Sequence, residues 1–219
     1  MKKTDMDLQS DVKAELAWDP SVQAQDVSVA VKEGIVTLTG SVFTFAEKLS
    51  AEAAVRRVSG VRGIAEELSV NLLGVHQRTD SDIAAAIATG LEWNTRVPQG
   101  AVTSLVEDGA VVLTGTVAWN CERVAAYQAV HHILGVKSIS NQILVKFRPA
   151  DATEIKNKIA GALKRLVHQD SAGIQVSAEH GRVVLDGTVH SWTEHDEATR
   201  SAWSAPGVTD VENDLVVVY

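Results

Sequence analysis

The sequence lacks the features that mark several large classes of protein. Its single cysteine, Cys121, cannot form a disulfide within the chain. No apolar run approaches the roughly 18 residues of a membrane span. Acidic residues outnumber basic ones by 28 to 20, which argues against a nucleic-acid-binding protein, because such proteins carry a basic surface. The N-terminal segment, MKKTDMDLQSDVK, follows two lysines with acids instead of an apolar core. We therefore expect a cytoplasmic protein without a secretory signal.

The sequence does contain one strand-like stretch in three versions. These are GIVTLTGSV at 34–42, GAVVLTGTV at 109–117 and GRVVLDGTV at 181–189. The spacings between these three stretches also align Leu8 with Ile83 and Ile155, and the alignment continues to the C-terminus without a gap. A repeat of this length predicts tandem copies of one folded unit. We expect three domains, covering residues 1–74, 75–149 and 150–219, joined by short polar linkers.

Each unit has the pattern helix, strand, strand, helix, strand. Apolar residues recur every fourth position in the first helix, and valines alternate in the strands. A glycine turn predicts that the first two strands form an antiparallel hairpin, and a right-handed helical crossover would make the third strand parallel to the second. The fold class is therefore α+β, a three-stranded mixed sheet with two helices on one face. The signature glycines are Gly34, Gly109 and Gly181 at the turn and Gly40, Gly115 and Gly187 at the end of the second strand.

This unit resembles the BON domain (bacterial OsmY and nodulation). The resemblance rests on the glycine-bounded strands 34–40, 109–115 and 181–187 and on the closing segments 135–145 and 207–217. It covers nearly the whole chain and implies αββαβ domains. It also implies an association with osmotic and envelope stress, with phospholipid binding and, in one branch, with potassium binding. Enzymatic activity is not typical of the family.

Candidate catalytic or metal-binding residues have simpler interpretations. Glu47, Glu122 and Glu194 recur in every copy; capping boxes with Thr44 and Ser191 account for the first and third, and Asn120 is a candidate cap in the second. Cys121 lacks a signalled partner histidine and is expected to be an ordinary semi-buried thiol. The histidines, including His190 and His195, lack a dense ligand motif and fit a solvated surface. Because ordinary enzyme motifs are missing as well, we expect no catalytic centre, no metal and no cofactor.

Two sets of aromatic residues have defined positions in the repeat. Trp18 and Trp93 align at the end of the first helix and favour packing in the core or at a domain edge. Phe45 and Trp192 align at the start of the second helix, and Trp119 lies one residue before that position. This aromatic rim either packs over the sheet edge or contacts a lipid surface or a protein partner. Both alternatives stay open on the sequence.

The main basic cluster is Lys156, Lys158, Lys164 and Arg165, in the first helix of the third unit. Lys158 and Arg165 lie opposite the apolar face of that helix, so they form either a solvated face or a contact for anionic head groups. Together with Phe45, Trp119 and Trp192 they are the candidate lipid- or partner-binding residues. The leading hypothesis is a non-enzymatic stress protein that contacts anionic phospholipid or a protein partner. The alternative is a soluble sensor of a monovalent cation of the potassium type.

Overall fold

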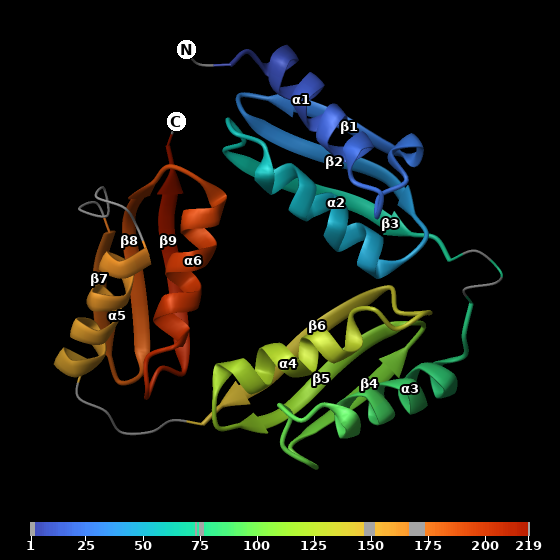
Figure 1. The fold of residues 1–219 in the computed structure, drawn as a ribbon. Coiled ribbons are helices and arrows are strands. Elements are labelled where there is room, and N and C mark those ends of the chain that lie inside the picture. The colour runs from blue at the N-terminus through green and yellow to red at the C-terminus, as the bar shows by residue number, and fades with distance from the viewer. Residues whose placement is uncertain (1–2, 73, 75–76, 147–151, 167–173, 219) are drawn as a thin grey trace.

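The computed structural model describes residues 3–72, 74, 77–146, 152–166 and 174–218, and it divides them into three domains of one design. Each domain contains its own three-stranded sheet. The three domains lie around a common centre, so that the first and third domains meet although they are far apart in sequence (Figure 1). The predicted fold class, three αββαβ units in tandem, is confirmed.

The elements follow the predicted order in every domain. Domain 1 contains α1 (Asp5–Trp18), the short helix η1 (Ala24–Asp26), β1 (Val27–Lys32), β2 (Ile35–Val42), α2 (Phe45–Arg57) and β3 (Gly63–Val70). Domain 2 contains α3 (Asp80–Trp93), β4 (Val102–Glu107), β5 (Ala110–Val117), α4 (Asn120–Val130) and β6 (Ser138–Val145). Domain 3 contains α5 (Ala152–Leu166), β7 (Ile174–Glu179), β8 (Arg182–Val189), α6 (Trp192–Trp203) and β9 (Asp210–Val217).

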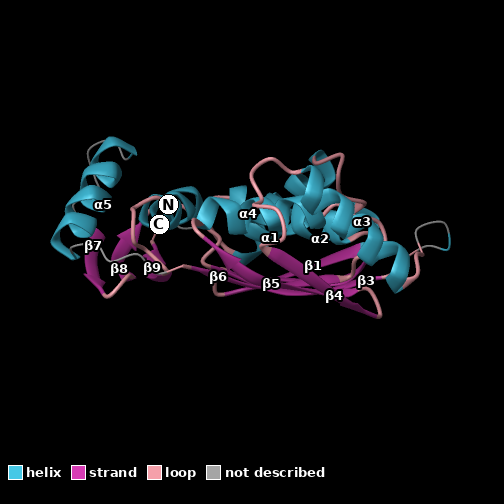
Figure 2. Ribbon diagram, turned by 90° about the horizontal axis from the view of Figure 1, so that it is seen from below, coloured by secondary structure: helices cyan, strands magenta, loops and turns pink. Residues whose placement is uncertain are grey.

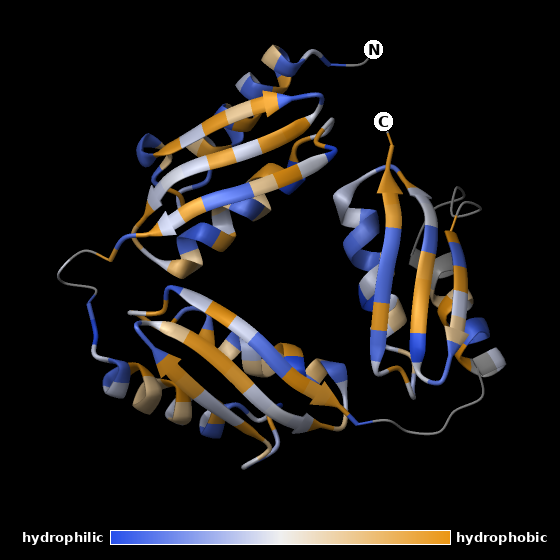
Figure 3. Cartoon of the chain, turned by 180° about the vertical axis from the view of Figure 1, so that it is seen from behind, coloured by the Kyte–Doolittle hydropathy of each residue, from blue (hydrophilic) through white to orange (hydrophobic). Residues whose placement is uncertain are grey.

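The sheets have the predicted mixed topology. In each domain the middle strand pairs antiparallel with the first strand and parallel with the third, in the same register (Val29 opposite Leu38, Leu38 opposite Glu66). The helices all lie on one side of the sheets, which gives the molecule a helix face and a sheet face (Figure 2). Seen from the sheet face, each strand carries both hydrophobic and hydrophilic residues (Figure 3), and successive side chains point to opposite faces of the sheet.

Two glycine positions explain why the repeated stretch is so constant. The hairpin turn has Glu33 at φ 53° and Gly34 at φ 79°, a pair of left-handed residues of the kind that two-residue hairpins need. The carboxylate of Asp5 accepts hydrogen bonds from both of their N–H groups, at 2.8 and 3.0 Å. At Gly40, φ is 123° and a side chain would overlap the carbonyl oxygen of Asp26. The glycine at this position therefore allows two backbone segments to approach closely.

The shared glutamate has a structural role at the start of the second helix. The Thr44 hydroxyl accepts a hydrogen bond from the Glu47 N–H, as predicted. The Glu47 carboxylate, however, bonds the N–H groups of Phe43 and Gln23, both at 2.8 Å, instead of that of the cap residue. Glu194 accepts from the His190 N–H in the same way. This carboxylate therefore ties the helix to the end of the preceding strand.

The core of each domain lies between its sheet and its two helices. In domain 1 the buried residues include Leu8, Val12 and Leu16 of α1, Val36 and Leu38 of β2, and Ala51 and Val55 of α2. The second and third domains bury the matching positions wherever the side chain is among those described. The second helices, α2, α4 and α6, lie toward the centre of the molecule, and the first helices, α1, α3 and α5, lie farther out (Figure 1).

Candidate functional site

The aromatic rim predicted from the sequence lies at the junctions between domains. Phe45, the first residue of α2 in domain 1, is only 7% exposed and belongs to the core cluster of domain 2, with Ile83 and Val111. Leu49 and Val70 of domain 1 pack against the same cluster. Phe45 is therefore an anchor between domains 1 and 2, and its side chain is not on the surface in this arrangement.

Trp192, at the equivalent position of domain 3, packs against the core of domain 1. Its indole N–H donates a 2.8 Å hydrogen bond to the carbonyl oxygen of Val61. The guanidinium of Arg56, in α2, lies 5.2 Å from the indole ring and donates to both carboxylate oxygens of Asp196, at 3.1 and 3.2 Å. His195 contacts the same indole edge-on, with 5.1 Å between ring centroids. The junction of domains 1 and 3 thus combines one half-buried aromatic with polar contacts.

The junction of domains 2 and 3 differs, because Asn120 occupies the position of Phe45 and Trp192. The Asn120 side-chain oxygen is buried without a hydrogen-bond partner, so the predicted capping by Asn120 is wrong; Trp119 is the N-cap residue. Trp119 itself is 39% exposed. Across this junction the Arg123 guanidinium lies 4.3 Å above the ring of Trp203. Burial lowers the pKa of Arg123, and the charge of Asp210 in domain 3 opposes that shift.

The prediction that Trp18 and Trp93 pack in the core or at a domain edge is wrong. Trp18 and Trp93 are the last residues of α1 and α3, and they are 83% and 82% exposed. Each lies just beyond a buried leucine, Leu16 or Leu91, and the helical rotation of 100° per residue turns a residue two positions later away from the core. The helix period contained this signal, because Trp18 is out of phase with Leu8, Val12 and Leu16. Both helices lie on the helix face (Figure 2).

The basic candidates lie in α5 of domain 3. Lys158 is exposed. The side chain of Arg165 lies outside the described residues, but its position in α5 corresponds, in the repeat register, to that of Trp18 and Trp93. The first helices of the three domains therefore carry tryptophan, tryptophan and arginine at one repeated position. Whether Phe45, Trp119, Trp192, Lys158 or Arg165 binds a lipid or a partner stays a prediction.

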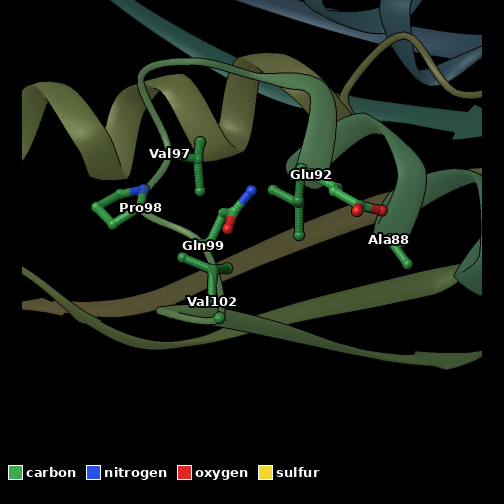
Figure 4. Close-up of a pocket in the computed structure, with 8 residues that line it drawn as sticks. Ala88, Glu92, Val97, Pro98, Gln99 and Val102 are labelled. Atoms are coloured by element: carbon green, nitrogen blue, oxygen red, sulfur yellow. The ribbon is translucent and has the colours of Figure 1, made fainter.

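A small pocket opens in domain 2, with a volume of about 340 Å³. It lies between the end of α3, which contributes Ala88 and Glu92, and the segment that carries Val97, Pro98 and Gln99 before β4 (Figure 4). The described lining provides one carboxylate and mostly apolar or backbone groups. The pocket therefore suggests no reaction.

The remaining candidate groups are Cys121 and the histidines. Cys121 is exposed instead of semi-buried. His195 pairs with Asp196 at 3.2 Å in the junction of domains 1 and 3, and His190 lies 3.8 Å from Glu194. Within the described part of the chain, no three or more His, Cys, Asp or Glu side chains are arranged to hold a metal ion. The same residues include no helix that is both long and apolar enough to cross a membrane.

Comparison with known proteins gives matches over most of the chain. The sequence model of the BON domain matches three times, at residues 4–71, 79–146 and 151–219. The osmotically-inducible protein Y of Escherichia coli (strain K12) is 31% identical over 146 residues, which are 62% of this chain and 69% of that protein. Two structures of CdsD, a structural protein of the type III secretion system of Chlamydia trachomatis, align over 97% and 99% of this chain and 92% and 100% of theirs, at 18% and 17% identity. Their TM-score of 0.27 is too low to support any argument about this protein.

Proposed function

Because the chain belongs to the BON domain family, we propose that it is a non-enzymatic protein of the osmotic stress response that attaches to phospholipid membranes through its helix face. The stress association is supported by its similarity to the osmotically-inducible protein Y. The membrane contact is supported by one observation above all, the two exposed tryptophans at matching ends of α1 and α3.

Tryptophan side chains are on average largely buried in folded proteins, so two that are almost fully exposed need an explanation. Tryptophan has a large apolar body and one N–H donor, so it is most stable where one side of the ring is apolar and the other is wet. The boundary between lipid tails and head groups is such an environment, and tryptophan is enriched there. Trp18 and Trp93, each more than 80% exposed, would partition into that boundary without any change in the fold.

Several weak contacts on one face of a protein can act together. A single indole provides a small affinity, but two that insert from the same molecule raise the effective concentration of each other at the membrane. The arginine at the corresponding position of α5, Arg165, would add a contact with phosphate, and Lys158 adds a second positive charge on that helix. The net charge of −8 opposes strong electrostatic attraction to anionic lipid. We therefore propose weak binding that depends more on indole insertion than on charge.

Co-sedimentation with vesicles of phosphatidylethanolamine and phosphatidylglycerol in equal parts tests this function. The double variant Trp18→Ala/Trp93→Ala should bind at least about tenfold more weakly than the wild type, because it loses both insertion points at once. The matched control is Trp119→Ala, which removes a partly exposed indole at the start of α4 and should bind as the wild type does.

Other outcomes would identify a different function. Equal sedimentation of the double variant and the wild type would contradict a role for these tryptophans. A loss of binding in Trp119→Ala alone would return the aromatic rim to consideration. If no form sediments, and potassium but not sodium raises the melting temperature, the cation sensor replaces the membrane protein, since a ligand that binds only the folded state stabilises it.

A further inference from the structure

Domain 3 is held against domain 1 by a small set of contacts that converge on one arginine. Arg56 of α2 donates to Asp196 of α6, which is 140 residues away in sequence. It also donates to Glu52 of its own helix, at 2.8 and 3.1 Å, and lies against the ring of Trp192. We call these contacts, together with the hydrogen bond from the Trp192 indole to the carbonyl oxygen of Val61, the α2–α6 latch.

The charged part of the latch is accessible to water. The side chains of Arg56 and Asp196 are 35% and 46% exposed. An ion pair at this exposure is screened by dissolved salt, because the screening length shortens from about 10 Å at 0.1 M to about 3 Å at 1 M. The contact of the indole with Val61 does not depend on a pair of full charges, so salt weakens the latch without removing all of it.

Among the described residues, the junction of domain 3 with domain 2 contains no buried apolar anchor like Phe45. At its junction with domain 2 the corresponding position is Asn120, with a buried oxygen that lacks a partner, and the described contact is that of Arg123 with Trp203. Domains 1 and 2, in contrast, share a hydrophobic cluster through Phe45. Burial of apolar surface is little weakened by salt and strengthened by some salts.

We propose that the α2–α6 latch is a switch that responds to ionic strength. At low salt it holds domain 3 against domain 1; as salt rises, domain 3 separates from domain 1, while domains 1 and 2 remain together. Separation exposes the Trp192 indole and the surface of domain 1 around Arg56. This behaviour does not depend on membrane binding, so it can be tested on the protein in solution.

Distances between dye labels on the full chain measure the opening. In a Cys121→Ser background, one labelled pair joins Ser10→Cys in α1 to Ser177→Cys in β7, across domains 1 and 3. A control pair joins Ser10→Cys to Ser138→Cys in β6, across domains 1 and 2. All three serines are exposed. With rising KCl or NaCl, the first distance should lengthen and broaden to the same extent in both salts, and the control distance should stay constant. Sucrose at equal osmolality should leave both unchanged.

Variants of Asp196 make the mechanism falsifiable. Asp196→Asn removes the ion pair, so the open population should be larger at low salt and should respond little to further salt. Asp196→Arg places a second positive charge beside Arg56, so the molecule should be open at low salt and should close as salt screens the repulsion. This reversal of sign is specific to an electrostatic latch. A response to potassium alone, an unchanged salt response in Asp196→Asn, or equal changes in both labelled pairs would overturn the proposal.

Discussion

The junction between domains 1 and 2 and the junction between domains 1 and 3 use the same position of the repeat in two different ways. At the first, Phe45 is buried in an apolar cluster with Leu49 beside it. At the second, Trp192 is partly buried, donates a hydrogen bond and is flanked by the Arg56–Asp196 pair. Leu49 and Asp196 occupy equivalent positions of their helices. One geometry therefore supports both an apolar and a polar junction.

The apolar junction and the polar junction differ in how strongly and how specifically they hold two domains together. Apolar burial stabilises roughly in proportion to area and depends little on orientation. Hydrogen bonds and ion pairs contribute less net free energy but require matching partners and respond to the solvent. Domains 1 and 2 are therefore expected to behave as a durable pair, and domain 3 as a unit that docks in one defined way and can be released. Three substitutions test this comparison.

The largest effect is expected for Phe45→Ala. The variant removes a buried ring from the cluster it shares with domain 2, so the free energy of unfolding should fall by about 3–5 kcal/mol. In chemical denaturation, domains 1 and 2 should then unfold in separate steps. Phe45→Leu, which keeps most of the apolar volume, should cost less than about 1.5 kcal/mol. A loss below about 1 kcal/mol in Phe45→Ala would show that the junction of domains 1 and 2 is not the stronger one.

A smaller effect is expected for Trp192→Phe. The substitution keeps an aromatic ring at the junction of domains 1 and 3 but removes the hydrogen bond to Val61, so the stability of the closed form should fall by about 1 kcal/mol. The distance between labels on domains 1 and 3 is the direct measurement. Trp18→Phe, at an exposed position, serves as the matched control and should stay within about 0.5 kcal/mol of the wild type. Equal effects of the two variants would contradict a role for the indole N–H.

The smallest change is expected at the third junction and should be stabilising. Asn120→Leu replaces a buried oxygen that lacks a hydrogen-bond partner by an apolar group of similar size, so stability should rise by about 0.5 kcal/mol. Asn120→Asp has the same shape but places a charge in the same position, and it should destabilise. Thermal unfolding measures both. If Asn120→Leu destabilises the protein, the asparagine has a role that the contrast between apolar and polar junctions does not include.

Some parts of the candidate site could be predicted from the sequence and others could not. The register fixed the equivalence of Phe45 and Trp192 and their position at the start of a helix, because that position follows from the local pattern. Their contacts with neighbouring domains depend on residues far away in sequence, such as Val61 for Trp192. The exposure of Trp18 and Trp93 was within reach, since their spacing from the buried leucines places them off the apolar stripe. The large apolar ring of tryptophan favoured the prediction that both side chains are buried. The helical periodicity of the apolar residues indicated the exposure that the structure shows.

The sequence by itself determined the repeated unit, its five elements and the direction of every strand. These features follow from hydrophobic period, turn glycines and the handedness of the crossover, all of which act within one unit of about 70 residues. Only the tertiary structure decided how the three units meet. The aromatic residue at the start of the second helix is compatible with solvent, lipid or a neighbouring domain. The choice depends on which surfaces, distant along the chain, are brought to within a few ångströms of it, as Arg56 and Val61 are brought to Trp192.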